Sequence, residues 1–354
     1  HQDVLKGERY FWYSTTGWMM YNYSLSALLL GATLCIYEGD SFFPDPDELW
    51  NFTSKATINH FGHGSVYYQK LLENIPDHCN ASKQPWIKTI AATGSVLYPE
   101  VAENLQRIFP KAHIISLSGG TDVCSAFLGG LPGESSTPGE LQCKLLGAAV
   151  AIFDEGGRPV IESAGELVIT APLISMPLYF WGDPGKKRYL ESYFERFDGV
   201  WTHGDWAKQT TKGSFILYGR SDATLNRHGI RIGTSELYTA LKKLGGIEDS
   251  LVIHLSDQKR DELLLFVQKS ASEASTLTSS EINNHLKQHL SPRHMADHIY
   301  FVTDLPYTLS GKKLEIPIRK ILQGAPIDTV VSIDSLRNPE ALDYFKNLTL
   351  HYEK

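Results

Sequence analysis

The sequence has few cysteines, no excess of positive charge and no long apolar run. Its four cysteines form no C-x-x-C pair among 354 residues, so no disulfide framework is indicated and reduced thiols are expected. The formal net charge of −7 excludes a net attraction to nucleic acid or to anionic lipid. Neither nucleic acid nor a membrane is therefore an expected partner.

The most apolar stretch, residues 25–37 (LSALLLGATLCIY), is shorter than the roughly 20 residues of a membrane-spanning helix. Gly31 within it is typical of a helix C-cap, so we expect a helix to end there and a buried strand to follow over 33–37. The opening segment, HQDVLKGERYF, contains no apolar core of a signal peptide. These features predict a soluble, cytoplasmic protein.

Composition and length indicate a folded chain with more than one domain. Hydrophobic residues make up 42% and charged residues 21%, which excludes a disordered or collagenous chain. At about 100–200 residues per domain, the chain corresponds to two or three domains. Residues 1–139 alternate helix-like and strand-like segments, such as the helical face of Val101, Leu105 and Ile108 and the apolar strand at 114–117. This order predicts part of a large α/β domain with a mostly parallel sheet.

The rest of the sequence predicts two further structural parts. Alternating segments over 147–153, 165–170 and 214–218, separated by glycine turns, predict an antiparallel, β-barrel-like subdomain over 140–218. Beyond it, a capping box at Thr278–Glu281 opens a helix that follows two apolar strands. We expect a small α+β C-terminal domain over 223–354, joined to the rest through residues 219–222.

Two motifs interrupt the first part where a ligand could bind. Ser118–Asp122 (SGGTD) follows a predicted strand; its glycines let backbone N–H groups approach a phosphate, its threonine can donate to that phosphate, and its aspartate can hold a divalent cation. Thr93–Pro99 (TGSVLYP) joins a strand to a helix, and its backbone could hold a ring or a phosphate. An ordinary turn explains SGGTD equally well.

Further motifs carry charged side chains. In the segment THGDW, Asp205 could accept both hydroxyls of a ribose, although aspartate after glycine is also ordinary turn chemistry. Arg220, Asp222 and Arg231 lie together at the change of domain, which also suits a polar linker. Lys312 follows Ser-Gly in a loop and could deliver a cation to a phosphate or carboxylate, although a solvated lysine is the commoner case.

Taken in order, these motifs resemble the adenylate-forming superfamily of acyl-CoA synthetases, and within it the branch that activates acetoacetate. The segments that carry the resemblance are FWYSTTGWMM at 11–20, GRSDATLNR at 219–227, LSPRH at 290–294 and TLSGKKLEIP at 308–317. The resemblance covers essentially the whole chain. It implies that a carboxylate reacts with ATP, in the presence of Mg²⁺, to give an acyl-adenylate and pyrophosphate, after which the thiol of coenzyme A displaces AMP.

The resemblance also implies roles for individual residues. Lys312 would bridge the acyl carboxylate and the α-phosphate during adenylation, and Thr121 would contact that phosphate. Asp205 would bind the ribose, and Asp122, where relatives usually carry glutamate, would hold Mg²⁺. The implied nucleotide-binding residues are Gly94, Ser95, Val96, Ser118, Gly119, Gly120, Thr121, Asp205, Arg220 and Arg231.

A second conformation follows from the same resemblance. Asp222 matches the hinge about which a mobile C-terminal domain turns. After that turn, Gly229 would line the pantetheine tunnel, and Lys287 would meet the 3′-phosphate of coenzyme A. One fixed site and one turning domain would then serve both half-reactions.

Gly119 bears on the size of the acid. Acetate-activating relatives carry tryptophan at this position, so Gly119 would remove a wall and leave room for a longer acid such as acetoacetate. The other implied pocket residues are Trp18, Met19, Met20 and Thr93. For the two methionines, ordinary core packing is a nearly equal alternative.

The family's Ser/Thr/Gly-rich triphosphate loop, which ends in lysine, does not occur in these 354 residues. We therefore expect the chain to be the C-terminal part of a larger enzyme and to be inactive in adenylation when isolated. Two alternatives stay open: a synthetase for another short-chain carboxylic acid, and a non-catalytic module that binds nucleotide or coenzyme A. His285 and His289 have no carboxylate partner at ligand spacing and are not interpreted as a metal site.

Overall fold

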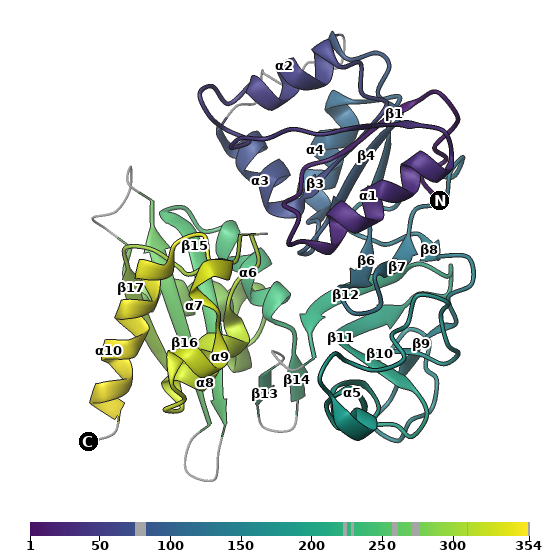
Figure 1. Ribbon diagram of the computed structural model, residues 1–354. Coiled ribbons are helices and arrows are strands. Elements are labelled where there is room, and N and C mark those ends of the chain that lie inside the picture. The colour runs from purple at the N-terminus through teal and green to yellow at the C-terminus, as the bar shows by residue number, and fades with distance from the viewer. Residues whose placement is uncertain are drawn as a thin grey trace. The chain divides into compact units, whose positions relative to one another are not determined.

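The computed structural model describes residues 1–74, 83–221, 225–227, 230–256, 261–270, 277–309 and 311–352. Within it the chain divides into two compact units, His1–Leu217 and Tyr218–Lys354, which are drawn in Figure 1. The fold class is mixed α/β, as the sequence predicts. Each unit is built around its own sheets and its own buried cores.

The first unit begins with a five-stranded parallel sheet in the order β2-β1-β3-β4-β5. Its strands are β1 (Arg9–Trp12), β2 (Thr33–Cys35), β3 (His60–Gly64), β4 (Thr89–Thr93) and β5 (His113–Ser116). The helices between them are α1 (Met19–Leu29), α2 (Glu48–Lys55), α3 (Ser65–Asn74) and α4 (Pro99–Ile108). The parallel sheet predicted from helix–strand alternation is therefore confirmed.

The helices cover both faces of this sheet because strand side chains alternate between the faces. Phe11 and Phe61 pack with side chains of α2, α3 and α4 in one buried cluster. Tyr10 and Trp12 pack with side chains of α1 in another. The expectation of a buried strand over 33–37 was wrong: β2 is an edge strand, and its Thr33 is exposed. Within the described sheet, β2 pairs with β1 on one side, and no described strand pairs with its other side.

The first unit continues with two antiparallel sheets. One has the order β6-β7-β8 and the other β12-β11-β10-β9. Their strands are β6 (Ser118–Gly120), β7 (Ser125–Gly129), β8 (Cys143–Lys144), β9 (Val150–Phe153), β10 (Ala164–Ile169), β11 (Trp201–Gln209) and β12 (Phe215–Arg220), with helix η2 (Pro184–Lys186) and α5 (Lys187–Tyr193) before β11. Phe127 of β7 and Trp201 of β11 belong to one buried cluster. The antiparallel part therefore includes β6 and β7, which lie before the predicted segment 140–218, and it consists of two sheets around a shared core.

The second unit has a three-stranded sheet in the order β15-β16-β17 and a small hairpin, β13-β14. These strands are β13 (Leu225–Arg227), β14 (Ile230–Ile232), β15 (Ile247–Ser256), β16 (Asp261–Lys269) and β17 (His298–Val302). Its α-helices are α6 (Thr234–Lys242), α7 (Ser279–His289), α8 (Glu315–Leu322), α9 (Ile327–Val330) and α10 (Leu342–Tyr352). The capping box predicted at Thr278 and Glu281 is confirmed at the start of α7.

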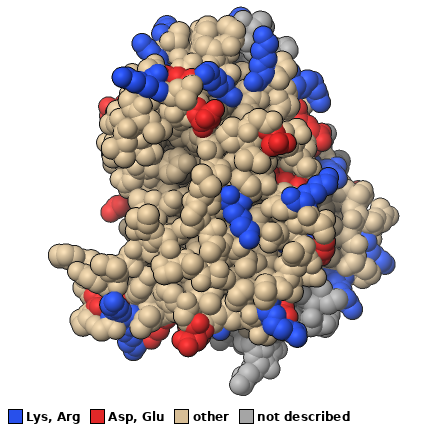
Figure 2. Space-filling view, turned by 90° about the vertical axis from the view of Figure 1, so that its right-hand side faces the viewer, with Lys and Arg blue, Asp and Glu red and all other residues tan. Residues whose placement is uncertain are grey.

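The helices and the charged side chains of the described residues were compared with a membrane-spanning segment and a basic surface strip. No helix among the described residues is long and apolar enough to cross a membrane. Figure 2 shows Lys and Arg interspersed with Asp and Glu on one face, where the described residues form no continuous basic strip.

Candidate functional site

The carboxyl ends of β4 and β5 lie together at one edge of the parallel sheet, the edge at which open α/β sheets bind ligands. Two hydrogen bonds join the segments that leave these strands. The Thr93 hydroxyl donates to the Leu117 carbonyl at 2.6 Å, and the Leu117 N–H donates to the Ala92 carbonyl at 2.8 Å. Two of the predicted motifs, TGSVLYP and SGGTD, therefore start from a fixed common base.

The turn after β4 is the first of these motifs. Gly94 has a φ of +89°, and a Cβ on it would lie 3.5 Å from the ring atom Cζ2 of Trp18. The Ser65 hydroxyl donates to the Ser95 carbonyl at 2.8 Å and holds the turn to the start of α3. Gly94, predicted beside an adenine with Ser95 and Val96, thus lies against Trp18, predicted in the acyl pocket.

The methionines after Trp18 differ from it. Met19 and Met20 are buried in the cluster that α1 forms with the sheet, where they pack near Trp12. Both side chains therefore contribute to a buried core.

The SGGTD motif forms one strand and a turn of a hairpin. Ser118, Gly119 and Gly120 are paired with β7 as strand β6 rather than forming the turn that was expected, and Ser118 is buried. The turn itself begins at Thr121, where Thr121 and Asp122 are exposed. The difference arises because β6 finds an antiparallel partner only a few residues ahead, a pairing that the glycines permit.

Both glycines of β6 are required by their immediate neighbours. A Cβ on Gly119 would lie 2.1 Å from the Ser125 carbonyl oxygen, and one on Gly120 would lie 2.7 Å from the ring atom Cε1 of His203. Real Cβ atoms do not approach so closely. Gly119 therefore has a structural requirement of its own, apart from any effect on the size of the acid.

This close contact predicts that Gly119→Ala lowers the free energy of unfolding of the first unit by about 1–3 kcal/mol, the usual cost of overpacking. The backbone of β7 would have to move, because the atom in contact is a carbonyl oxygen rather than the end of a side chain. Urea unfolding measures the change. Gly17→Ala is the control, since the nearest atom to its new Cβ is 3.8 Å away. Equal unfolding midpoints for the two variants would refute the contact.

The sequence predicted Asp205 between two strands, but the structure places it inside strand β11. The pairing of β10 with β11 shifts register between Glu166 and Val168, and Gly204 has a φ of +85°. This β-bulge, a feature that often re-aims side chains near sites, brings two polar side chains together. His203 is buried, and its Nε2 lies 3.8 Å from Asp205 Oδ2 and 3.2 Å from the Gly119 carbonyl oxygen.

Tyr193 and Trp201 extend this arrangement to the other carboxylate. The Tyr193 hydroxyl donates to Asp122 Oδ2 at 2.5 Å. Its ring stacks on Trp201 with centroids 3.6 Å apart, and Trp201 Nε1 lies 3.4 Å from His203 Nδ1. The sequence patterns did not single out Tyr193, Trp201 or His203; the one available signal was that His203 lies two residues before Asp205, within the segment THGDW.

His63 is a fourth residue that the patterns missed. It lies one residue before the end of β3, at the same sheet edge, and is stacked between Tyr13 and Tyr67 at centroid distances of 4.5 and 3.9 Å. Burial lowers the pKa of His63 to about 3, so its ring is neutral at physiological pH. Its Nδ1 accepts a hydrogen bond from the Gly64 N–H at 2.7 Å, which places the proton on Nε2.

Asp122 has the chemistry of a magnesium ligand. The described residues contain no group of three or more His, Cys, Asp or Glu side chains that could hold a metal ion. Mg²⁺ in nucleotide sites commonly needs only one or two carboxylates, because phosphate oxygens and water complete its shell. A single carboxylate in an exposed turn fits that pattern.

Lys312 belongs to the second unit, in a tight turn. Its N–H donates to the Thr308 hydroxyl at 2.9 Å, its carbonyl accepts from the Thr308 N–H at 3.0 Å, and its side chain is exposed. The next residue differs: Lys313 Nζ bonds Asp249 Oδ1 at 2.6 Å and lies 4.0 Å from the centre of the Tyr238 ring. Of these adjacent lysines, Lys313 has a structural function and Lys312 extends from a fixed backbone.

The other predicted residues of the second unit are spread over several elements. Arg220 is exposed at the end of β12, Lys287 is exposed on α7, and Arg231 pairs with Asn226 in the β13–β14 hairpin. Asp222 and Gly229 lie outside the described residues.

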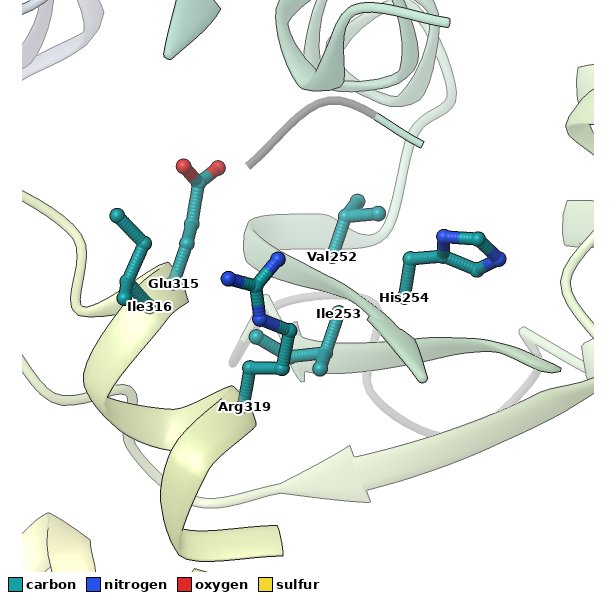
Figure 3. A pocket seen from close by; sticks show the side chains of 6 residues that line it. All are labelled: Val252, Ile253, His254, Glu315, Ile316 and Arg319. Carbon is teal, nitrogen blue, oxygen red and sulfur yellow. The ribbon is translucent and has the colours of Figure 1, made fainter. Parts of the chain in front are cut away.

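A small recess in the second unit contains none of the predicted residues. It is lined by Val252, Ile253, His254, Glu315, Ile316 and Arg319. Figure 3 shows Glu315 and Arg319 side by side on one face of α8. The Tyr238 hydroxyl donates to Glu315 at 2.5 Å. A carboxylate beside a guanidinium gives little net positive charge, so this recess does not have the character of a phosphate site.

The chain belongs to the AMP-binding enzyme family, whose model matches residues 1–180. It is 37% identical to the acetoacetyl-coenzyme A synthetase of Rhizobium meliloti over 350 residues, 98% of this chain and 53% of that protein. It is 38% identical to the acetoacetyl-CoA synthetase of Caenorhabditis elegans over 353 residues, 97% of this chain and 50% of that protein.

Comparison with solved structures also finds similar chains. The acetoacetyl-CoA synthetase of Streptomyces lividans matches 99% of this chain with a TM-score of 0.90 and 37% identity, and the match covers 54% of that chain. A benzoate CoA ligase from Burkholderia xenovorans matches 89% of this chain and 62% of its own with a TM-score of 0.73, at 20% identity, which shows the fold alone. This chain spans about half the length of the curated relatives it matches.

Proposed function

We propose that the protein carrying this chain is an ATP-dependent acid–thiol ligase that forms acetoacetyl-CoA. Acetoacetate and ATP give acetoacetyl-adenylate and pyrophosphate; the thiol of coenzyme A then attacks the acyl carbon, and AMP leaves. The observation that carries the proposal is the similarity to acetoacetyl-CoA synthetases along 97–98% of the chain, rather than within one motif.

The site supports the first half-reaction in the following way. The turn at 94–96 would lie beside the adenine, and Asp205 would accept the two ribose hydroxyls. Thr121 and the N–H groups of its turn would donate to the α-phosphate, and Asp122 would hold Mg²⁺ against the phosphates. The cation would neutralise phosphate charge as pyrophosphate leaves.

The second unit would supply the remaining groups. Lys312, on its fixed turn, would stabilise the charge shared by the acyl carboxylate and the α-phosphate. For thioester formation, a turn about Asp222 would bring Gly229 to the pantetheine arm, and Lys287 would meet the 3′-phosphate of coenzyme A. We place this enzyme in the cytoplasm, whose reducing conditions suit the unpaired Cys35, Cys124 and Cys143.

A panel of carboxylic acids tests the proposal. Pyrophosphate release is measured in the protein carrying this chain with ATP, Mg²⁺ and acetate, propionate, acetoacetate, isobutyrate or benzoate. Acetoacetate is expected to give a kcat/KM at least tenfold above every other acid. A higher value for another acid would replace acetoacetate as the substrate, and no release with any acid would leave the non-catalytic binding module as the function.

A further inference from the structure

His203 lies at the point where strand β11 meets the SGGTD hairpin. We propose that His203, as a neutral imidazole with its proton on Nε2, is a positioning residue that holds the hairpin of residues 118–122 against Asp205. It would thereby set the geometry in which the site binds an adenine nucleotide. That last part rests on the proposed function; the positioning itself does not.

The two hydrogen bonds of the ring assign its tautomer. Nε2 lies 3.2 Å from the carbonyl oxygen of Gly119, which can only accept, so Nε2 carries the proton. Nδ1 lies 3.4 Å from Trp201 Nε1, which can only donate, so Nδ1 carries none. A protonated ring would turn a second N–H toward the Trp201 N–H, so the neutral form suits both partners.

The packing around the ring fixes its position. Phe127 meets His203 edge-on, with ring centroids 4.6 Å apart and an interplanar angle of 76°. Gly120 of β6 leaves the space that the ring occupies, because a Cβ on Gly120 would lie 2.7 Å from Cε1 of His203. The Cβ atom of any other residue at position 120 would therefore clash with the imidazole.

The neutral ring has an electrostatic consequence for Asp205. A carboxylate that faces an imidazolium at 3.8 Å would share its charge in an ion pair. A neutral ring places no positive charge beside Asp205 Oδ2. His203 thus orients the hairpin without neutralising the carboxylate beside it.

The same side chains connect the first strand of the hairpin with its turn. His203 holds Gly119, in the strand before the turn, and Trp201 joins His203 to Tyr193, which holds Asp122 in the turn. Two attachments on either side of Thr121 restrict how this residue can move. The proposed phosphate contact would therefore be preorganised, which lowers the cost of binding.

The first experiment titrates the 354-residue chain with AMP in a calorimeter. Glutamine can reproduce both contacts, because its amide N–H reaches an acceptor and its carbonyl accepts from Trp201. We expect His203→Gln to bind AMP within about threefold of wild type and His203→Leu to bind it at least tenfold more weakly. His113→Leu is the control, since it removes another histidine of the first unit that is hydrogen-bonded, to Gln142, and should leave AMP binding unchanged. Equal affinity of His203→Leu and wild type would overturn the proposal.

Two further measurements are independent of the nucleotide. Ring ¹⁵N chemical shifts are expected to show the Nε2–H tautomer of His203 at neutral pH; an Nδ1–H tautomer or an imidazolium would overturn the assignment. Gly120→Ala is expected to lower the urea midpoint more in the native background than in His203→Ala, and equal shifts would contradict the contact. If the wild-type chain binds no AMP, the proposed function fails for this chain, while these two results still decide whether His203 positions the hairpin.

Discussion

Replacing Lys312 with alanine is expected to slow acyl-adenylate formation about a thousandfold in the protein carrying this chain. At an effective dielectric constant near 20, a unit charge about 4 Å from the reacting phosphate contributes about 4 kcal/mol, and each 1.4 kcal/mol is about tenfold in rate. Thioester formation from supplied acetoacetyl-adenylate should stay near the wild-type rate. Single-turnover assays measure the two half-reactions separately.

Two further variants serve as controls for the Lys312→Ala result. Lys320→Ala removes another exposed lysine of the second unit, on α8, and should leave both half-reactions unchanged. Lys312→Arg keeps the charge but changes the donor geometry, so it should recover part of the lost rate. Equal loss of both half-reactions in Lys312→Ala would contradict a role confined to adenylation.

Replacing Asp205 with alanine is expected to weaken AMP binding at least about a hundredfold. A hydrogen bond to a charged acceptor contributes about 1.5–3 kcal/mol, and Asp205 would accept two from the ribose. Calorimetry on the 354-residue chain measures the change. Asp205→Asn keeps one acceptor oxygen and should fall between alanine and wild type.

The matched control for Asp205 is Asp154→Ala. Asp154 is a turn aspartate of the same unit that accepts from its own loop, at the Gly156 and Arg158 N–H groups. Its loss should affect that turn and leave AMP binding within about twofold of wild type. If Asp205→Ala also binds AMP within twofold of wild type, Asp205 is a structural residue of the bulge and has no part in the ribose site.

Elements with a strong local signal could be predicted from the sequence. The helical face of Val101 and Leu105 is buried in α4 as expected, and the capping box at Thr278 starts α7. These features depend on residues three or four positions apart, which is the range over which a helix is determined. The same holds for Gly31 just beyond α1, where its φ of +73° is that of a helix C-cap.

Features that depend on distant pairing could not be predicted in this way. The bulge at Gly204 exists because β11 pairs with β10, and the strand conformation of Gly119 and Gly120 exists because β7 lies opposite. The contact between Tyr193 and Asp122 joins residues 71 positions apart. The motifs drew attention to Asp122 and Asp205, but the side chains that contact these carboxylates became visible only in the fold.

The central claim, that this chain belongs to an enzyme that activates acetoacetate as an acyl-adenylate, is tested most directly by an isotope transfer. Acetoacetate labelled with ¹⁸O in its carboxylate is incubated with ATP, Mg²⁺, coenzyme A and the protein carrying this chain, and the AMP is examined by mass spectrometry. Because the carboxylate oxygen attacks the α-phosphate and stays on AMP when the thiol attacks the acyl carbon, the account predicts one ¹⁸O per AMP formed, together with acetoacetyl-CoA and unlabelled pyrophosphate. Unlabelled AMP, or ADP and phosphate in place of AMP and pyrophosphate, would contradict it.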